Sequence, residues 1–291
     1  MAPQARIGVI GGSGLYQIEG LTDIEEVSID TPFGRPSDDI VLGTLSGVRV
    51  AFLPRHGRGH RISPSELPSQ ANVWAMKLLG VTHLLSISAV GSLREELAPR
   101  DVVIPDQILD RTKGVRPTTF FGDGVVVHIA FAEPYCPELR QIIYDAAGKV
   151  EGVTVHQGGT MVVMEGPQFS TKAESHFYRQ IGGDLIGMTA LPEAKLAREA
   201  EICYSTIAMV TDYDCWREAE ESVTVEMVVA NLLANVDVSK NILKAAVSAI
   251  AEAPRNCDCH RALADALITH REALPPDRLE TLRPLLGKYL G

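Results

Sequence analysis

The sequence predicts an α/β fold: a single domain built on a largely parallel central sheet. Short apolar runs rich in β-branched residues recur along the chain, and segments with helical periodicity lie between them. Several of these runs are almost continuously hydrophobic, which is typical of strands covered on both faces. Strands that alternate with helices favour a mostly parallel sheet with helices packed against it.

Each element follows from its local pattern. Strands are predicted at the short apolar runs, which are 7–10, 39–45, 48–54, 82–91, 101–105, 159–165, 184–189 and 202–212. Helices are predicted where apolar residues recur at helical spacing, which is the case at 65–80, 137–149, 171–181, 189–201, 223–252 and in a shorter segment beginning near Arg261. We expect one domain over residues 1–253 and a helical C-terminal extension over 254–291 packed on the same domain.

Composition excludes several classes of protein. The formal net charge of −10 argues against a nucleic-acid or membrane-surface partner, because either would require a basic face. No apolar run approaches the ~18–20 residues of a membrane span, and the N-terminus lacks the pattern of a signal peptide. The five cysteines are an odd number at scattered spacings, which favours a reduced, cytoplasmic protein.

The glycine-rich turn after the first strand, in "IGVIGGSGLY" at residues 7–16, is compatible with two kinds of site. A dinucleotide site needs glycine or alanine at position 17, where Gln17 stands, and a phosphate-binding P-loop needs a lysine that is absent here. What remains is a turn that offers backbone N–H groups and the Ser13 hydroxyl. This arrangement suits a small anion, although a tight turn without a ligand is the alternative.

Two further strand ends carry groups that bind oxyanions. Arg55 and His56 follow the strand at 48–54, and Ser88 lies near the end of the strand at 82–91. The guanidinium of arginine suits phosphate. Because open α/β sheets bind ligands at the carboxyl ends of their strands, we expect Ser13, Arg55, His56 and Ser88 to converge on one oxyanion.

Metal binding is not expected. His56 and His60 are four residues apart, but the glycines between them disfavour a helix and no third ligand is nearby. Cys257 and Cys259 form a CxC pair beside His260, which suggests redox or metal chemistry as alternatives. Thiols in such an irregular segment are more often inert, so we assign no role to them.

Five stretches together resemble the trimeric purine nucleoside phosphorylase family. They are "GVIGGSGLY" (8–16), "PRHGRGH" (54–60), "GSLREEL" (91–97), "TMVVMEGPQFSTKAES" (160–175) and "GMTALPEAKLAREAEICYSTIAMVTDYDCW" (187–216). The resemblance implies one domain of nucleoside phosphorylase type with a mixed central sheet flanked by helices. It also implies a homotrimer or a dimer of trimers, with inorganic phosphate as co-substrate and with neither a metal nor an organic cofactor.

Within the family, the motifs are most similar to members that act on 5′-methylthioadenosine. The implied reaction is phosphorolysis to adenine and 5-methylthioribose 1-phosphate, a step of purine and methionine salvage. The resemblance assigns phosphate binding to Ser13, Arg55, His56, Ser88, Ala89 (through its backbone) and Thr189. It assigns the nucleoside to Met188, Phe169, Asp212, Asp214, Val225 and Val228, with His128 contributed by a neighbouring subunit.

The two aspartates suggest how the base is activated and selected. An acid at Asp212, with its pKa raised by burial, would protonate N7 of the departing purine, with His56 and Ser88 as the other catalytic candidates at the phosphate. An ionised carboxylate at Asp214 accepts hydrogen bonds only, so it suits the 6-amino group of adenine. The alternative is that both aspartates cap the following helix.

Other activities remain open on the sequence alone. A 6-oxopurine nucleoside or methylthioinosine phosphorylase would differ only in the base that it accepts, and Gly187 stands where some relatives carry asparagine. A hydrolase would use water in place of phosphate, but no aspartate cluster for calcium opens this chain. A non-catalytic nucleoside-binding protein would need no acid beside the leaving base.

Overall fold

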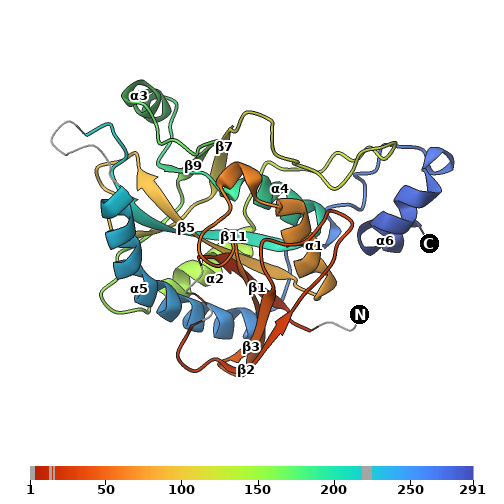
Figure 1. Ribbon diagram of the computed structural model, residues 1–291, viewed down its shortest axis with the longest axis horizontal. Coiled ribbons are helices and arrows are strands. Elements are labelled where there is room, and N and C mark those ends of the chain that lie inside the picture. Colours follow the sequence, from red (N-terminus) through yellow and green to blue (C-terminus); the bar gives the residue numbers. More distant parts are fainter. Residues whose placement is uncertain (1–3, 13–14, 16, 218–224, 291) are drawn as a thin grey trace.

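The computed structural model describes residues 4–12, 15, 17–217 and 225–290, except for the side chains of 225–230 and 232–235. Its described strands form one eleven-stranded mixed sheet (Figure 1). The strands are β1 (Ile7–Gly11), β2 (Thr22–Val27), β3 (Ile40–Leu45), β4 (Val48–Pro54), β5 (His83–Ser92), β6 (Val102–Ile104), β7 (Gln107–Arg111), β8 (Val155–Gln157), β9 (Thr160–Met164), β10 (Leu185–Gly187) and β11 (Cys203–Asp212).

The sheet branches at its central strand. One path runs β2-β3-β4-β1-β5-β10-β9-β7, and β11 leads from the other side of β5 to β6 and β8. Pairing is parallel along β4-β1-β5-β11, along β10-β9-β7 and between β6 and β8. It is antiparallel between β2 and β3, β3 and β4, β5 and β10, and β6 and β11. The predicted α/β fold with a mixed, largely parallel sheet is confirmed.

Every predicted strand is present, and three further strands were missed. β2 is exposed along almost its whole length and pairs only with β3. β7 is half-buried to exposed, and β8 has three residues that pair only with β6. Strands at the edge of a sheet are not buried on both faces, so they lack the continuous apolar run that identifies the central strands.

The helices follow the predicted periodicity with two corrections. They are α1 (Ser69–Leu78), α2 (Pro137–Ala147), α3 (Lys172–Gln180), α4 (Ala190–Glu199), α5 (Val225–Glu252) and α6 (Pro276–Leu290). The helix predicted from residue 65 begins at Ser69, because Pro68 disfavours helical conformation in the residue before it. The helix predicted to begin near Arg261 is wrong: a short 3-10 turn at Asp258–Arg261 ends there. α6 starts at Pro276, where the fixed proline φ suits a first helical residue.

Helices cover both faces of the sheet. α1 and α4 pack together on one side, and α2 and α5 pack together on the other (Figure 1). Each pair has its own hydrophobic cluster, one around Trp74 and Leu196 and the other around Ile143 and Leu243. The continuous burial of β11, and of β5 except at Ser88 and Ala89, follows from this arrangement. None of the helices in the described ranges combines the length and apolarity needed to cross a bilayer.

The C-terminal segment shares the core of the rest of the chain. Leu263, Leu282 and Leu286 are almost completely buried and belong to the same hydrophobic cluster as Trp74. These contacts support our proposal that residues 254–291 are an extension packed on the domain formed by residues 1–253.

Glu199, the last residue of α4, connects this helix to the loop at residues 119–120. Its buried carboxyl accepts hydrogen bonds from Thr119 Oγ1 at 2.6 Å and from the Phe120 N–H at 2.7 Å. Burial raises the pKa of Glu199 to about 7, although both hydrogen bonds oppose the rise. The folded protein therefore holds a proton here more tightly than the unfolded chain does.

Replacing Glu199 with glutamine should make the protein progressively more stable than wild type as pH rises. A carboxyl whose pKa is raised by folding stabilises the fold below its unfolded pKa, and this contribution is lost as pH rises through the folded value near 7. Glutamine does not ionise. The difference in unfolding free energy, variant minus wild type, should increase by about 2 kcal/mol between about pH 5.5 and about pH 8.5. Urea unfolding at both pH values measures this, and a difference that does not change with pH would contradict the assignment.

Candidate active site

The largest concentration of predicted site residues lies where β5 changes partners. β5 pairs with β1 as far as Ser86 and with β10 from Gly91 onward. Among the described strands, none pairs with residues 87–90 on that side, whereas β11 pairs along the other side. A cavity of about 460 Å³ occupies this opening, and residues 87–91 line it. The pocket is therefore formed by the opening between β1 and β10.

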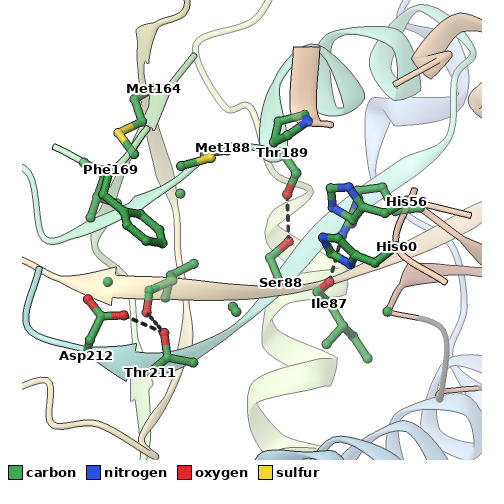
Figure 2. A pocket seen from close by; sticks show the side chains of 18 of the residues that line it. His56, His60, Ile87, Ser88, Met164, Phe169, Met188, Thr189, Thr211 and Asp212 are labelled. Atoms are coloured by element: carbon green, nitrogen blue, oxygen red, sulfur yellow. Dashed lines mark hydrogen bonds between the residues drawn. The ribbon is translucent and has the colours of Figure 1, made fainter. Parts of the chain in front are cut away.

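The pocket brings together residues from distant parts of the sequence. The predicted site residues that line it are Arg55, His56, Ser88, Ala89, Phe169, Met188, Thr189, Asp212 and Asp214. In Figure 2, the histidines, Ser88 and Thr189 occupy one end, and Phe169, Met164 and Asp212 occupy the other. Ser13 lies outside the described residues. Val225 and Val228 belong to α5, but their side chains lie outside the described part of the chain.

His128 lies away from this pocket in its own chain. Its backbone N–H donates to the Ala266 carbonyl at 2.8 Å, and the residue lines a second cavity together with Arg198 and Asp265. The family resemblance assigns His128 to the site of a neighbouring subunit. That role stays a prediction.

Hydroxyl and imidazole groups line one end of the pocket. Ser88 Oγ and Thr189 Oγ1 are 3.1 Å apart, one on β5 and the other immediately before α4. His56 Nδ1 is 2.8 Å from the Ile62 carbonyl oxygen. A carbonyl can only accept, so Nδ1 is protonated and donates this hydrogen bond, and Nε2 of the neutral ring is an acceptor. Burial, with the nearby positive charge of Arg55, lowers the pKa of His56 to about 4. This end is therefore a set of neutral donors and acceptors.

Arg55 is a buried residue whose side chain is largely occupied by the protein itself. Its Nε and Nη2 donate to the Glu193 carboxylate at 2.9 and 3.2 Å. Nη2 also contacts Ser86 Oγ and the Ile10 carbonyl, and Nη1 donates to the Ile87 carbonyl. Burial alone would lower the Arg55 pKa, but attraction to Glu193 outweighs it and raises the pKa. Arg55 therefore lines the pocket with its charge already paired, which the sequence analysis did not foresee.

An aromatic ring and two carboxyl groups line the other end. Phe169 reaches the pocket and keeps 47% of its surface exposed, whereas Asp212 is only 7% exposed. Asp212 Oδ1 accepts from the Asp214 N–H at 2.8 Å, and Oδ2 accepts from Thr211 Oγ1 at 2.7 Å. These two hydrogen bonds fix the plane of the Asp212 carboxyl group at the end of β11.

Gly91 provides the space that Asp212 occupies. A Cβ atom at Gly91 would lie 3.0 Å from Asp212 Oδ1 and 2.9 Å from the Ile186 side chain, so a larger residue would displace the carboxyl. Burial raises the pKa of Asp214, the second carboxyl of the pocket. The raised pKa expected at Asp212 stays a prediction.

A second buried ion pair, also missed from the sequence, holds the loop around Met188. Arg116 Nε donates to Glu165 Oε1 at 2.8 Å, and Nη1 donates to the Met188 and Leu191 carbonyls at 2.5 and 2.8 Å. Glu165 also accepts from the Ser65 hydroxyl. Arg116 lies in none of the five stretches that carry the resemblance, and Glu193 lies in the last of them but was given no role there. Only their burial and pairing in the folded chain identify them.

Comparison with known proteins identifies the family. Residues 6–248 match the Phosphorylase superfamily, and the chain belongs to it. Proteins named S-methyl-5′-thioadenosine phosphorylase are similar over nearly the whole length. One from Chloroflexus aurantiacus is 59% identical, with 98% of each chain covered, and one from Geobacter sulfurreducens is 54% identical, with 98% of this chain and 99% of the other covered.

Solved structures of similarly named proteins also resemble this chain. A methylthioadenosine phosphorylase from an Antarctic soil metagenomic library is 52% identical, with a TM-score of 0.93 over 97% of this chain and 99% of the other. A mutant adenosine/methylthioadenosine phosphorylase from Schistosoma mansoni, in complex with adenine, is 38% identical. Its TM-score is 0.83, and 93% of this chain and all of the other are covered. The resemblance inferred from the motifs is thereby confirmed.

Proposed function

We propose that this chain catalyses the phosphorolysis of 5′-methylthioadenosine to adenine and 5-methylthioribose 1-phosphate. The observation that carries the proposal is one cavity with hydroxyls and His56 at one end and Phe169 with two aspartates at the other. The names of the similar proteins support it, since those relatives cover nearly the whole chain.

Phosphate binds at the hydroxyl end. Ser88 and Thr189 are 3.1 Å apart and donate to its oxygens, together with the Ala89 N–H and Ser13. The Nε2 atom of neutral His56 accepts a hydrogen bond from the protonated oxygen of HPO₄²⁻. Arg55, anchored by Glu193, adds a fixed positive charge nearby, although most of its N–H groups are already engaged. Preorganised donors of this kind are the main source of transition-state stabilisation.

The purine binds at the opposite end, against Phe169. A phosphate oxygen forms the bond to C1′ as the bond from C1′ to N9 breaks, and the electron pair goes to the purine. Asp212 delivers a proton to N7, so that the base leaves neutral. The proton of HPO₄²⁻ replaces the one that Asp212 gives up, through His56 and solvent, so the overall reaction needs no added acid. Met188 packs under the ribose, held by Arg116.

The 5′-methylthio group points toward α5. Val225 and Val228 lie three residues apart on this helix, so they share one face. An apolar face there favours a methylthio group over a 5′-hydroxyl, which would lose hydrogen bonds to water. His128 of a neighbouring subunit completes this side of the pocket, which makes a homotrimer or a dimer of trimers part of the proposal. We propose a cytoplasmic enzyme that uses neither an organic cofactor nor a catalytic metal.

The assay that tests the proposal compares four nucleosides. Methylthioadenosine, adenosine, inosine and methylthioinosine are each incubated with the protein, with and without inorganic phosphate, and the released base is measured by chromatography. Adenine should appear only with phosphate and fastest from methylthioadenosine. A 6-oxopurine nucleoside as best substrate would overturn the assignment of the base, and release without phosphate would overturn phosphorolysis.

Asp214→Asn should shift base preference toward 6-oxopurines. Asparagine can donate a hydrogen bond, whereas the ionised carboxylate only accepts one. The ratio of kcat/KM for methylthioadenosine to that for methylthioinosine should fall by about 10–100-fold, the size of a hydrogen bond to a charged group. Because burial raises the pKa of Asp214, the same ratio should fall in wild type toward low pH, as the carboxyl takes up a proton. An unchanged ratio in the variant would remove Asp214 from base selection.

A further inference from the structure

Four of the five cysteines lie close together in the fold, although they come from three distant segments of the sequence. Their Sγ atoms all lie within 4.8 Å of one another, and those of Cys203 and Cys257 are 3.3 Å apart. We call this group the four-cysteine cluster; its members are Cys136, Cys203, Cys257 and Cys259. The fifth cysteine, Cys215, lies beside the pocket residue Asp214 and is not part of it.

The four sulfurs come from three local structures. Cys136 is the N-cap residue of α2, and Cys203 is the first residue of β11. Cys257 and Cys259 flank the start of the 3-10 turn in the C-terminal extension. All but the half-buried Cys257 are almost completely buried, in the hydrophobic cluster under α2 and α5. The irregular segment that contains the CxC pair is therefore directed onto the core.

His260 is not a member of the group. Its exposed ring turns back, so that Nδ1 is 2.7 Å from the Cys257 carbonyl oxygen. The sequence alone suggested His260 as a partner of the CxC pair. The partners that the fold supplies are Cys136 and Cys203, which lie more than fifty residues upstream.

A backbone N–H and a guanidinium lie beside the sulfurs and can donate to thiolates. The Leu139 N–H, in the first turn of α2, points at Cys136 Sγ at 3.5 Å, and a helix N-terminus stabilises a negative sulfur. The guanidinium of Arg255 lies beside Cys203 and Cys257.

Arg255 places a positive charge at the four-cysteine cluster. Its Nη2 donates to the Glu201 carbonyl at 2.7 Å, which orients the guanidinium. Its Nε is buried and has no hydrogen-bond partner among the described residues. A buried guanidinium beside sulfurs is well compensated by thiolates and poorly compensated by neutral thiols.

We propose that the four-cysteine cluster binds one Zn²⁺ ion as a structural tetrathiolate site. Zinc prefers four tetrahedral ligands, and a Zn–S bond of ~2.3 Å places the sulfurs roughly 3.8 Å apart. The observed separations reach that geometry with shifts of less than about 1 Å. Binding releases four protons as four thiols become thiolates. The site then carries two negative charges, which face Arg255.

All four ligands come from the protein, so the site is closed and not catalytic. Its effect is mechanical: the zinc ion ties the C-terminal extension to the start of β11 and to α2. A path for the metal exists in the single chain, because Cys257 and Cys259 line a second cavity whose wall also carries Glu133, Glu138 and Asp265. Carboxylates attract a divalent cation to such an entrance.

Metal analysis of the full-length protein tests the proposal. Wild type, Cys136→Ser, Cys259→Ser and the control Cys215→Ser are produced in zinc-supplemented medium and purified with a thiol reductant and without chelator. Mass spectrometry of the metals should find about one zinc per chain in wild type and in the control, and less than a tenth of that in the two cluster variants. Equal zinc in all four proteins would contradict the assignment of the ligands.

Two measurements on wild type decide the matter even if the cluster variants fail to fold. Thiols are counted after unfolding in chelator without reductant: zinc binding predicts five, whereas two disulfides within the cluster would leave one and overturn the proposal. Metal-free, reduced protein is then titrated with ZnCl₂ against a chromophoric chelator. Uptake of one equivalent is expected, and no uptake would overturn the proposal. Neither result bears on phosphorolysis.

Discussion

Asp212→Asn should lower kcat for methylthioadenosine by about 10²–10⁴-fold with little change in KM, because general acid catalysis contributes that much. Asparagine has the same shape. Its Oδ1 can still accept from the Asp214 N–H, and its amide can face Thr211, so the pocket geometry is kept. What is lost is a proton that can move to N7 of the purine. Steady-state kinetics at saturating phosphate measures the effect.

The control for this variant is Asp30→Asn. Asp30 is an exposed carboxylate paired with Arg35 on the surface, and its replacement should leave kcat unchanged. A kcat of Asp212→Asn within tenfold of wild type would remove Asp212 as the acid. In that case Asp214, whose pKa is raised by burial, would be the next candidate.

Glu193→Gln should destabilise the protein by about 3–5 kcal/mol. The substitution leaves the guanidinium of Arg55 buried without its counter-charge, and breaking a buried ion pair on one side costs this much. Tyr204 also loses the carboxylate that its hydroxyl contacts at 2.9 Å. Chemical unfolding of variant and wild type, at equal protein concentration, measures the loss.

A matched surface variant separates burial from charge. Glu25 pairs with Arg49 at 3.2 Å near the sheet edge, and both side chains are partly exposed. Glu25→Gln should cost less than about 1 kcal/mol, as exposed pairs do. A loss in Glu193→Gln as small as that of Glu25→Gln would mean that Arg55 is not held by this pair. The fixed position of Arg55 in the pocket would then need another explanation.

The central strands were predictable because strands that are buried on both faces have continuous apolar sequences. β5 and β11 are covered on both faces, so they are read from their apolar runs. The exposed strand β2 has no continuous apolar run. The C-terminal helix was misplaced because helical periodicity near Arg261 does not reveal where the chain turns. The start of α6 at Pro276 is instead determined by local proline geometry.

The candidate site was predictable where it follows a rule of topology. His56 follows β4, and Ser88 lies on β5 beyond its pairing with β1; both strands pair in parallel with β1, so the two residues line one pocket. No rule of this kind predicts the positions of Glu193 and Arg116. Each forms an ion pair with one buried partner that is distant in sequence. The four-cysteine cluster shows the same limit. Spacing reveals the CxC pair, but only the folded chain brings Cys136 and Cys203 to it.

The fate of labelled phosphate tests the central claim most directly. Methylthioadenosine is incubated with the protein and fully ¹⁸O-labelled inorganic phosphate in unlabelled water, and the sugar product is analysed by mass spectrometry. If a phosphate oxygen attacks C1′, the product is 5-methylthioribose 1-phosphate that retains all of the label, including the oxygen between carbon and phosphorus. Free methylthioribose that carries the oxygen of water, with the labelled phosphate unchanged, would contradict phosphorolysis.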